Sequence, residues 1–172
     1  MISRKFLSIK WYKDVLIFFL RVKFHFKNPP KNKLIIFDKE SIDDLYEIFK
    51  DYKYFILENR LNHMNNFYFN FKILKLIIYF YRGNFMTAYL KSMISIINPE
   101  NVITFIDNSE KFFELAKFYE NKIIFSAIQN GARYEIKENN FIFKNKINNN
   151  NNNIFINNFF CFGNYERYLY KK

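Results

Sequence analysis

Polar residues able to bind or position a substrate follow several short apolar runs of the sequence. They are Asp38, Arg60, Asp107, Asn108, Ser109, Gln129, Asn130 and Arg133. In open α/β sheets ligands bind beyond the carboxyl ends of the strands, so these residues predict a polar rim for a substrate. Each also has a simpler explanation: Asp38 could merely end a strand, Asn108 and Ser109 could cap a helix, and Arg60 could be a solvated charge.

The dipeptide Asn130-Gly131 has two interpretations. Asn-Gly is a preferred sequence of type I′ hairpin turns, because both positions tolerate positive φ, and here it stands between residues 123–129 and residues 133–136. The same place, just after a predicted strand, suits a loop that contacts a ligand. The residues themselves leave both interpretations open.

Several familiar chemistries are excluded by residue type and spacing. Gly83, Gly131 and Gly163 are the only glycines, and they are too far apart for a dinucleotide fingerprint or a P-loop. The single cysteine, Cys161, excludes an internal disulfide and is more typical of a small buried hydrophobe than of a nucleophile. Two histidines without a cysteine cluster predict no metal site. We therefore expect no cofactor and no metal, and we assign no catalytic residue.

Alternating strands and helices are expected to position the polar rim. Predicted strands cover residues 34–37, 54–57, 102–106 and 123–128, and predicted helices begin near Ser41 and cover 67–81, 85–97 and 110–119. Strands separated by such helices pair in parallel through right-handed crossovers, with helices on both faces. The fold class is thus α/β, a Rossmann-like, mostly parallel sheet over residues 33–172. Residues 154–162 could add a strand, and residues 138–153, with a run of six Asn, predict a low-complexity insertion.

Residues 1–32 predict a basic amphipathic helix over residues 1–26, followed by a linker. Its apolar stripe consists of Trp11, Val15, Phe18, Phe19, Val22 and Phe26. The longest apolar run there is far below the ~20 residues that span a bilayer, and no signal-peptide cleavage site follows it. Two interpretations have equal weight. The stripe could lie in the inner-leaflet interface with basic residues near anionic headgroups, or the helix could pack on the domain.

The net charge of +11 is concentrated in this N-terminal segment. Residues 1–33 contain nine basic residues and one acid, which leaves 18 basic and 15 acidic residues for the remainder. A nucleic-acid binder gathers Arg, Lys and exposed aromatics along one face. The nearly balanced body therefore argues against a nucleic-acid partner.

Two strings of the sequence resemble a known family. Residues 102–109, Val-Ile-Thr-Phe-Ile-Asp-Asn-Ser, followed by Phe112-Phe113-Glu114-Leu115-Ala116, and residues 128–133, Ile-Gln-Asn-Gly-Ala-Arg, resemble a bacterial surface carbohydrate biosynthesis family. The family is related to glycosyltransferases of the two-Rossmann-domain (GT-B-like) class. The end of the chain, residues 162–172, resembles the point where that family's chain heads for its second domain, and the match covers roughly residues 33–172.

The resemblance implies the amino-terminal, acceptor-side half of a transferase that builds surface polysaccharide or lipopolysaccharide. Such a protein would be cytoplasmic and could lie at the inner face of the cytoplasmic membrane. Its partners would be a glycan or lipid-linked acceptor, with the nucleotide-sugar held only by a second domain that this chain lacks. Asp107, Asn108 and Ser109 match the first string and Gln129, Asn130, Gly131 and Arg133 match the second, so both sets would border the cleft.

Two alternatives from other functional classes remain. The chain could be a non-catalytic peripheral membrane or scaffolding module that uses its N-terminal helix. It could also be a basic nucleic-acid-binding protein, although the charge distribution disfavours this. Without a donor site, we expect little or no transferase activity from this chain alone.

Overall fold

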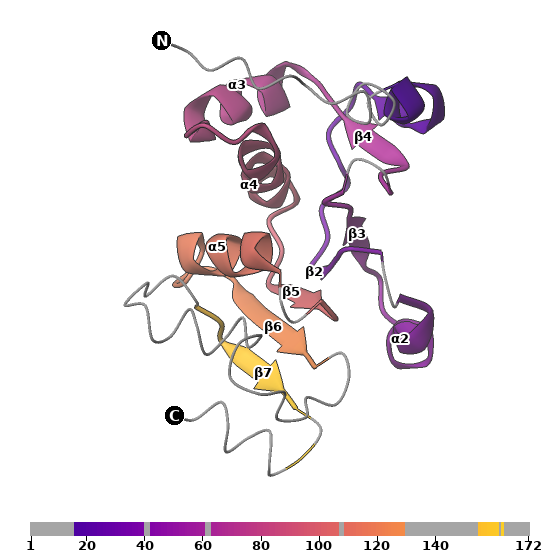
Figure 1. Ribbon diagram of the computed structural model, residues 1–172, viewed down its shortest axis with the longest axis vertical. Coiled ribbons are helices and arrows are strands. Elements are labelled where there is room, and N and C mark those ends of the chain that lie inside the picture. Colours follow the sequence, from indigo (N-terminus) through magenta and orange to yellow (C-terminus); the bar gives the residue numbers. More distant parts are fainter. Residues whose placement is uncertain are drawn as a thin grey trace, which may run out of the picture.

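A five-stranded parallel sheet forms the centre of the molecule (Figure 1). The computed structural model describes residues 16–39, 42–60, 63–106, 109–129, 155–161 and 163, leaving aside the side chains of residues 43–45. The strands are β2 (Leu34–Phe37), β3 (Phe55–Leu57), β5 (Asn101–Thr104), β6 (Ile124–Ile128) and β7 (Asn158–Phe160), in the order β3-β2-β5-β6-β7. The predicted α/β class with a parallel, Rossmann-like sheet is confirmed.

The strand order reverses between β2 and β5. From β2 the chain passes through α2 (Ile42–Phe49) to β3, which lies on one side of β2. It then returns through α3 (Phe71–Phe80) and α4 (Phe85–Ile97) to β5 on the other side, and α5 (Glu110–Phe118) connects β5 to β6. Ile36 is in register with both Ile56 and Ile103. The carboxyl ends of β2, β3 and β5 therefore meet at one edge of the sheet.

The two faces of the sheet bury alternate side chains, as the period of a strand requires. On one face Ile35 and Phe37 belong to the main core with α4 and α5, and the ring of Phe112 lies 5.4 Å from that of Phe37. On the other face Ile36 packs against Phe49 of α2. Helices thus cover both faces, as crossovers in a parallel sheet predict (Figure 1).

Polar side chains start the helices α3, α4 and α5. Asn70, Asn84 and Ser109 are the N-cap residues of α3, α4 and α5, and each side chain accepts from a backbone N–H three residues further on. Such caps satisfy donors that have no partner within the helix. The starts predicted for α4 and α5 are confirmed, whereas α3 begins at Phe71 rather than at residue 67.

A second, two-stranded sheet accounts for two errors in the sequence prediction. β1 (Lys23–His25) pairs in parallel with β4 (Asn66–Tyr68), and residues 16–21 before it are helical. The prediction of one helix up to residue 26 is therefore wrong for residues 23–25, and the prediction of helix from residue 67 is wrong for 67–68. Pairing between residues 43 apart in the chain fixes both segments, and no local pattern encodes it. Residues 1–15 lie outside the described residues.

The predicted membrane-facing stripe is divided by the fold. Phe18 and Val22 are each 7% exposed and belong to the main core, and the Phe18 ring lies 5.7 Å from that of Phe67 on β4. The prediction is wrong for these two residues, because the pairing of β1 with β4 gives them an apolar partner within the protein. Phe19 and Phe26 are 60% and 76% exposed, whereas Trp11 and Val15 are outside the described residues. No helix in the part of the chain that the structure describes could cross a bilayer.

Two buried tyrosines stabilise the packing of α4. The Tyr119 hydroxyl donates to the Lys91 carbonyl at 2.8 Å and lies 2.8 Å from the Ser95 hydroxyl. Burial raises the pKa of Tyr119 to about 12, opposed by the hydrogen bond from Ser95. The Tyr89 hydroxyl accepts from the Tyr68 backbone N–H at 3.1 Å, and burial raises the pKa of Tyr89 as well. Both phenols are therefore held neutral in the folded protein.

Candidate functional site at the carboxyl edge of the sheet

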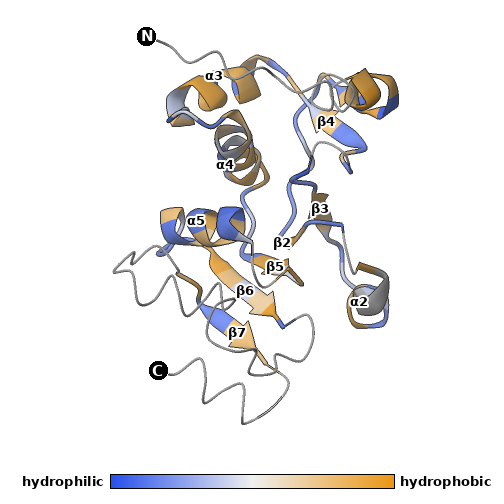
Figure 2. Cartoon of the chain, viewed as in Figure 1, coloured by the Kyte–Doolittle hydropathy of each residue, from blue (hydrophilic) through white to orange (hydrophobic). Residues whose placement is uncertain are grey.

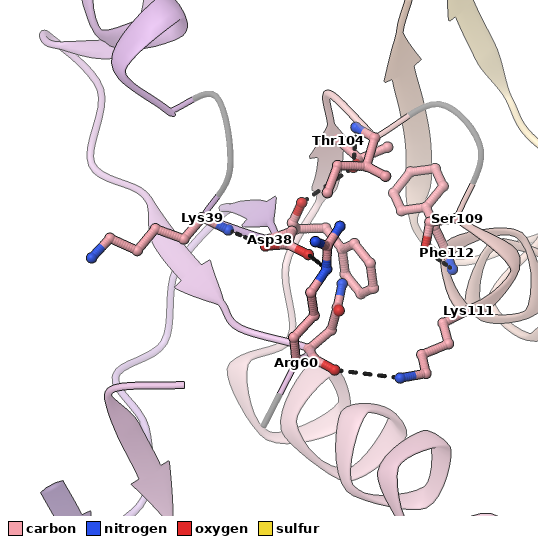
Figure 3. A network of polar contacts seen from close by, with 10 residues as sticks. Asp38, Lys39, Arg60, Thr104, Ser109, Lys111 and Phe112 are labelled. Atoms are coloured by element: carbon pink, nitrogen blue, oxygen red, sulfur yellow. Dashed lines mark hydrogen bonds and ion pairs between the residues drawn. The ribbon is translucent and has the colours of Figure 1, made fainter. Parts of the chain in front are cut away.

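Asp38 and Arg60 meet where β2 and β3 end. Asp38 directly follows β2 and is 2% exposed, and its Oδ2 lies 3.1 Å from Nε of Arg60. Arg60 comes three residues after β3, and its side chain is 37% exposed. The guanidinium therefore compensates a buried carboxylate on its inner side and reaches solvent on its outer side. The parallel pairing of β2 with β3 brings together these two residues that the sequence analysis had identified separately (Figure 3).

The backbone of Asp38 is in an unusual conformation. Its φ of 75° is in the left-handed region, which residues other than glycine rarely adopt. Its N–H donates to the Leu57 carbonyl at 3.0 Å, and its Oδ1 accepts from the Lys39 N–H at 2.7 Å. Aspartate tolerates this conformation better than most residues because its short side chain can bond locally. Backbone strain held in place by surrounding structure is frequent at binding sites.

Thr104 connects β5 to β2 at the reversal of strand order. Its hydroxyl, which is fully buried, donates to the Phe37 carbonyl at 3.2 Å and accepts from the Ile106 N–H at 3.0 Å. Figure 3 shows Thr104 beside the Asp38–Arg60 pair. The hydroxyl fixes the start of the segment that leads to residues 107–109.

The loop after β3 is held by Glu58 and reached by α5. Glu58, 8% exposed, accepts from the backbone N–H groups of Asn65 and Asn66 at 2.8 and 3.1 Å. From the first turn of α5, Lys111 Nζ donates to the Asn59 carbonyl at 3.4 Å. Elements that follow β5 and β3 thus contact each other at the edge where β2 also ends (Figure 3).

The remaining predicted site residues are only partly described. Ser109 caps α5 by accepting from the Phe112 N–H at 3.3 Å, so the capping explanation is supported for its hydroxyl. Gln129 follows β6, is 1% exposed, and donates its backbone N–H to the Phe160 carbonyl at 2.9 Å. Asp107, Asn108, Asn130, Gly131 and Arg133 lie outside the described residues, so the choice between hairpin and ligand loop at Asn130-Gly131 stays open.

This polar edge is suited to binding rather than to covalent chemistry. It offers a partly exposed guanidinium, an ammonium and backbone groups at strand ends, which are donors for hydroxyl-rich or anionic ligands. Among residues 16–39, 42–60, 63–106, 109–129, 155–161 and 163, no group of three or more His, Cys, Asp or Glu could hold a metal ion. The edge lies at the reversal of strand order, where open α/β sheets bind their ligands.

Sequence reasoning missed four contributors to this edge: Glu58, Asn59, Thr104 and Lys111. Glu58 and Asn59 directly precede Arg60, so their position after a predicted strand was a usable signal. Thr104 lies inside the predicted strand 102–106, and only the observed end of β5 shows that it terminates the strand. Lys111 gave no signal, because its partner is 52 residues away in the chain.

Comparisons of the chain with models of known families, with curated proteins and with solved structures found no match.

Proposed function

We propose that this domain binds the glycan acceptor of a GT-B-like transferase of bacterial surface polysaccharide or lipopolysaccharide synthesis. The observation that carries the proposal is the convergence of Asp38, Arg60 and Thr104 at the reversal of strand order. The proposal also draws on the resemblance of residues 102–109 and 128–133, because the first string begins within β5 and the second begins at the last residue of the neighbouring strand β6.

The nature of the polar edge favours an acceptor over a nucleotide-sugar. Nucleotide phosphates are commonly held by a glycine-rich turn at a helix N-terminus, and the only glycines of this chain are residues 83, 131 and 163. Sugar hydroxyls need only convergent donors and acceptors, such as those of Arg60 and the strand ends. We therefore assign the donor nucleotide to a second domain, and catalysis to the cleft between two such domains.

Titration of the full chain followed by amide NMR tests this proposal. The probes are a deacylated lipopolysaccharide core oligosaccharide and, separately, UDP-N-acetylglucosamine. We expect the oligosaccharide to shift the amide signals of Arg60 and Ser109, because these amides lie at the carboxyl edge. UDP-N-acetylglucosamine should leave the Ser109 signal in place. If the nucleotide-sugar shifts these amides and the oligosaccharide does not, the domain is on the donor side and the proposal is wrong.

A pair of variants links such binding to the edge. Ser109→Asp retains an N-cap, since Asp and Ser are similar caps, but adds a negative charge and should weaken oligosaccharide binding severalfold. Lys33→Gln is the control, because Lys33 is an exposed residue at the opposite, amino end of β2, where it pairs with Glu100 at 2.9 Å. Equal binding by wild type and Ser109→Asp would remove Ser109 from the site.

A second proposed function, membrane apposition, is favoured by an N-terminal apolar patch. The patch consists of Leu16, Phe19 and Leu20, which lie within about one turn of each other on the helical residues 16–21 and are 60–80% exposed. Phe26, 76% exposed, follows directly after β1. Figure 2 shows the short helix beside β4 coloured as partly hydrophobic. Lys23 and Lys27 are exposed next to it in the sequence. Apolar and basic side chains together are typical of a surface that binds anionic lipid.

Vesicle flotation tests this second proposal with point variants. Deleting residues 1–32 would also remove Phe18 and Val22 from the core, so we prefer Leu20→Ser. Flotation with vesicles of phosphatidylcholine and phosphatidylglycerol should fall for this variant. Ile48→Ser on α2 is the control, since Ile48 is also 60% exposed but lies outside the patch. Unchanged flotation of Leu20→Ser would reject the patch as a membrane contact.

A further inference from the structure

An open pocket of about 320 Å³ lies beside the Asp38–Arg60 pair. It is lined by Arg21, Lys39, His63 and Asn65, which come from three separate segments. Arg21 ends the helical residues 16–21, Lys39 follows Asp38, and His63 and Asn65 belong to the loop between β3 and β4. The volume is at the lower end of the ~300–1,000 Å³ typical of small-molecule sites.

The wall that carries His63 and Asn65 is held from inside the protein. Glu58 accepts from the Asn65 backbone N–H and from its Nδ2, at 2.8 and 3.2 Å. Met64, between the two lining residues, is 1% exposed, and its carbonyl accepts from Arg21 Nη2 at 3.3 Å. The loop and the Arg21 guanidinium are thus fixed relative to each other, which lowers the entropy lost on binding a ligand.

The described residues that line the pocket include two basic side chains, Arg21 and Lys39. The ring of His63 can add a third donor. Among the residues that the structure describes, no acid lines the pocket, and the carboxylates of Glu58 and Asp38 already have partners at Asn65 and Arg60. Guanidinium and ammonium groups converging on an open hollow are the donor set that phosphate oxygens prefer.

We propose that this pocket binds a phosphate or pyrophosphate group. It is continuous with the polar edge, because Lys39 follows Asp38 and the His63 N–H donates to the Arg60 carbonyl at 3.0 Å. An acceptor held at the edge could therefore place an anionic group in the pocket, as a lipid-linked sugar or a sugar phosphate would. This identification of the ligand rests on the proposed function, whereas the anion site itself does not.

Calorimetric titration of the full chain with inorganic pyrophosphate tests the site. We expect saturable binding that weakens with added salt, since surface charges are screened. Lys39→Gln and Arg21→Gln should each weaken binding about tenfold, the loss expected for a charge-assisted contact worth ~1.4 kcal/mol. Lys33→Gln removes the same charge at the opposite edge of the sheet and should bind like the wild type.

Two further probes distinguish the sources of the anion. Geranyl pyrophosphate carries a short prenyl chain, and glucose 1-phosphate carries a sugar. Tighter binding of the first than of pyrophosphate indicates a lipid-linked ligand, and tighter binding of the second indicates a sugar phosphate, each through the same pocket. Binding of all three at the affinity of pyrophosphate means that the pocket recognises the anion alone.

The results that overturn the inference are separate from those that overturn the proposed function. Absence of pyrophosphate binding rejects the pocket as an anion site. Equal weakening of binding by Lys33→Gln and Lys39→Gln also rejects it, because binding would then depend only on net charge. Oligosaccharide binding at the polar edge could still be observed in that case. Conversely, pyrophosphate binding that depends on Lys39, without any oligosaccharide binding, supports the pocket and rejects the acceptor function.

Discussion

Substitution of Asp38 separates the energetic contributions of its backbone and its side chain. The residue combines a φ of 75° with a buried carboxylate that pairs with Arg60 and accepts from the Lys39 N–H. Ala removes the carboxylate but keeps a Cβ on a residue whose backbone is in the left-handed region. Gly removes the carboxylate and adopts positive φ without a Cβ clash. Asn keeps a side-chain acceptor and tolerates this backbone, but loses the charge.

The expected losses follow from these contacts. The Arg60 side chain is 37% exposed, so solvent screening limits the ion pair to about 1 kcal/mol, and the Lys39 N–H bond adds about 1 kcal/mol. A Cβ on a residue with left-handed backbone costs ~1–2 kcal/mol, and wild-type Asp38 already has this cost. Gly removes it, although the greater unfolded-state entropy of Gly offsets ~0.4–1 kcal/mol of the gain. We therefore expect a loss of about 1 kcal/mol for Asn, about 1 for Gly and about 2 for Ala.

Urea denaturation of the full chain, followed by far-ultraviolet circular dichroism, measures these differences in the free energy of unfolding. Asp51→Ala is the control, because Asp51 is exposed in the turn after α2 and such surface changes stay within about 0.5 kcal/mol. If Asp38→Gly is destabilised as much as Asp38→Ala, backbone conformation does not matter at this position and the reasoning is refuted.

Three further predictions concern residues around the site and in the core. Thr104→Val should cost about 1–3 kcal/mol in thermal denaturation, because it removes a buried donor to the Phe37 carbonyl, whereas Thr104→Ser should lose less; equal losses would mean that the hydroxyl is unimportant. Glu58→Gln should speed hydrogen exchange at the Asn65 amide, because that N–H then bonds a neutral acceptor; unchanged exchange would contradict the role of Glu58 in holding the loop. Burial raises the pKa of Tyr119 to about 12 in the folded protein, against about 10 unfolded, so its stabilising contribution is complete below pH 10 and is lost as the pH rises through 12. Tyr119→Phe should therefore be less stable than wild type at pH 7 and lose less stability between pH 9 and 11; parallel pH curves for the two proteins would disprove this coupling.

The predicted elements were most accurate where one local signal was strong. The apolar runs at residues 34–37 and 123–128 became β2 and β6 within one residue, and Ser109 caps α5 as its type suggested. Errors occur at β1 and β4, short strands that lie in sequences with helical periodicity. A three-residue strand has too few residues to show an alternating pattern, so its pairing partner decides its conformation.

The sequence predicted where the candidate site lies better than it predicted which residues form it. Placing Asp38 and Arg60 at strand ends required only the apolar runs before them. Their contact, the inclusion of Thr104 and the bond from Lys111 to Asn59 required the order of the strands. The pocket could not have been predicted, since Arg21 belonged to a segment expected to form a separate helix.

By itself, the sequence determined the α/β class, most helix and strand positions, and the polar residues that follow the strands, because these depend on periodicity and caps within a few residues. Tertiary structure decided which of those residues meet. Parallel pairing with β2 in the middle brought the ends of β3 and β5 together, and pairing of β1 with β4 buried Phe18 and turned Arg21 toward the pocket. Contacts between residues far apart in the chain depend on strand order and register, which short-range patterns do not contain.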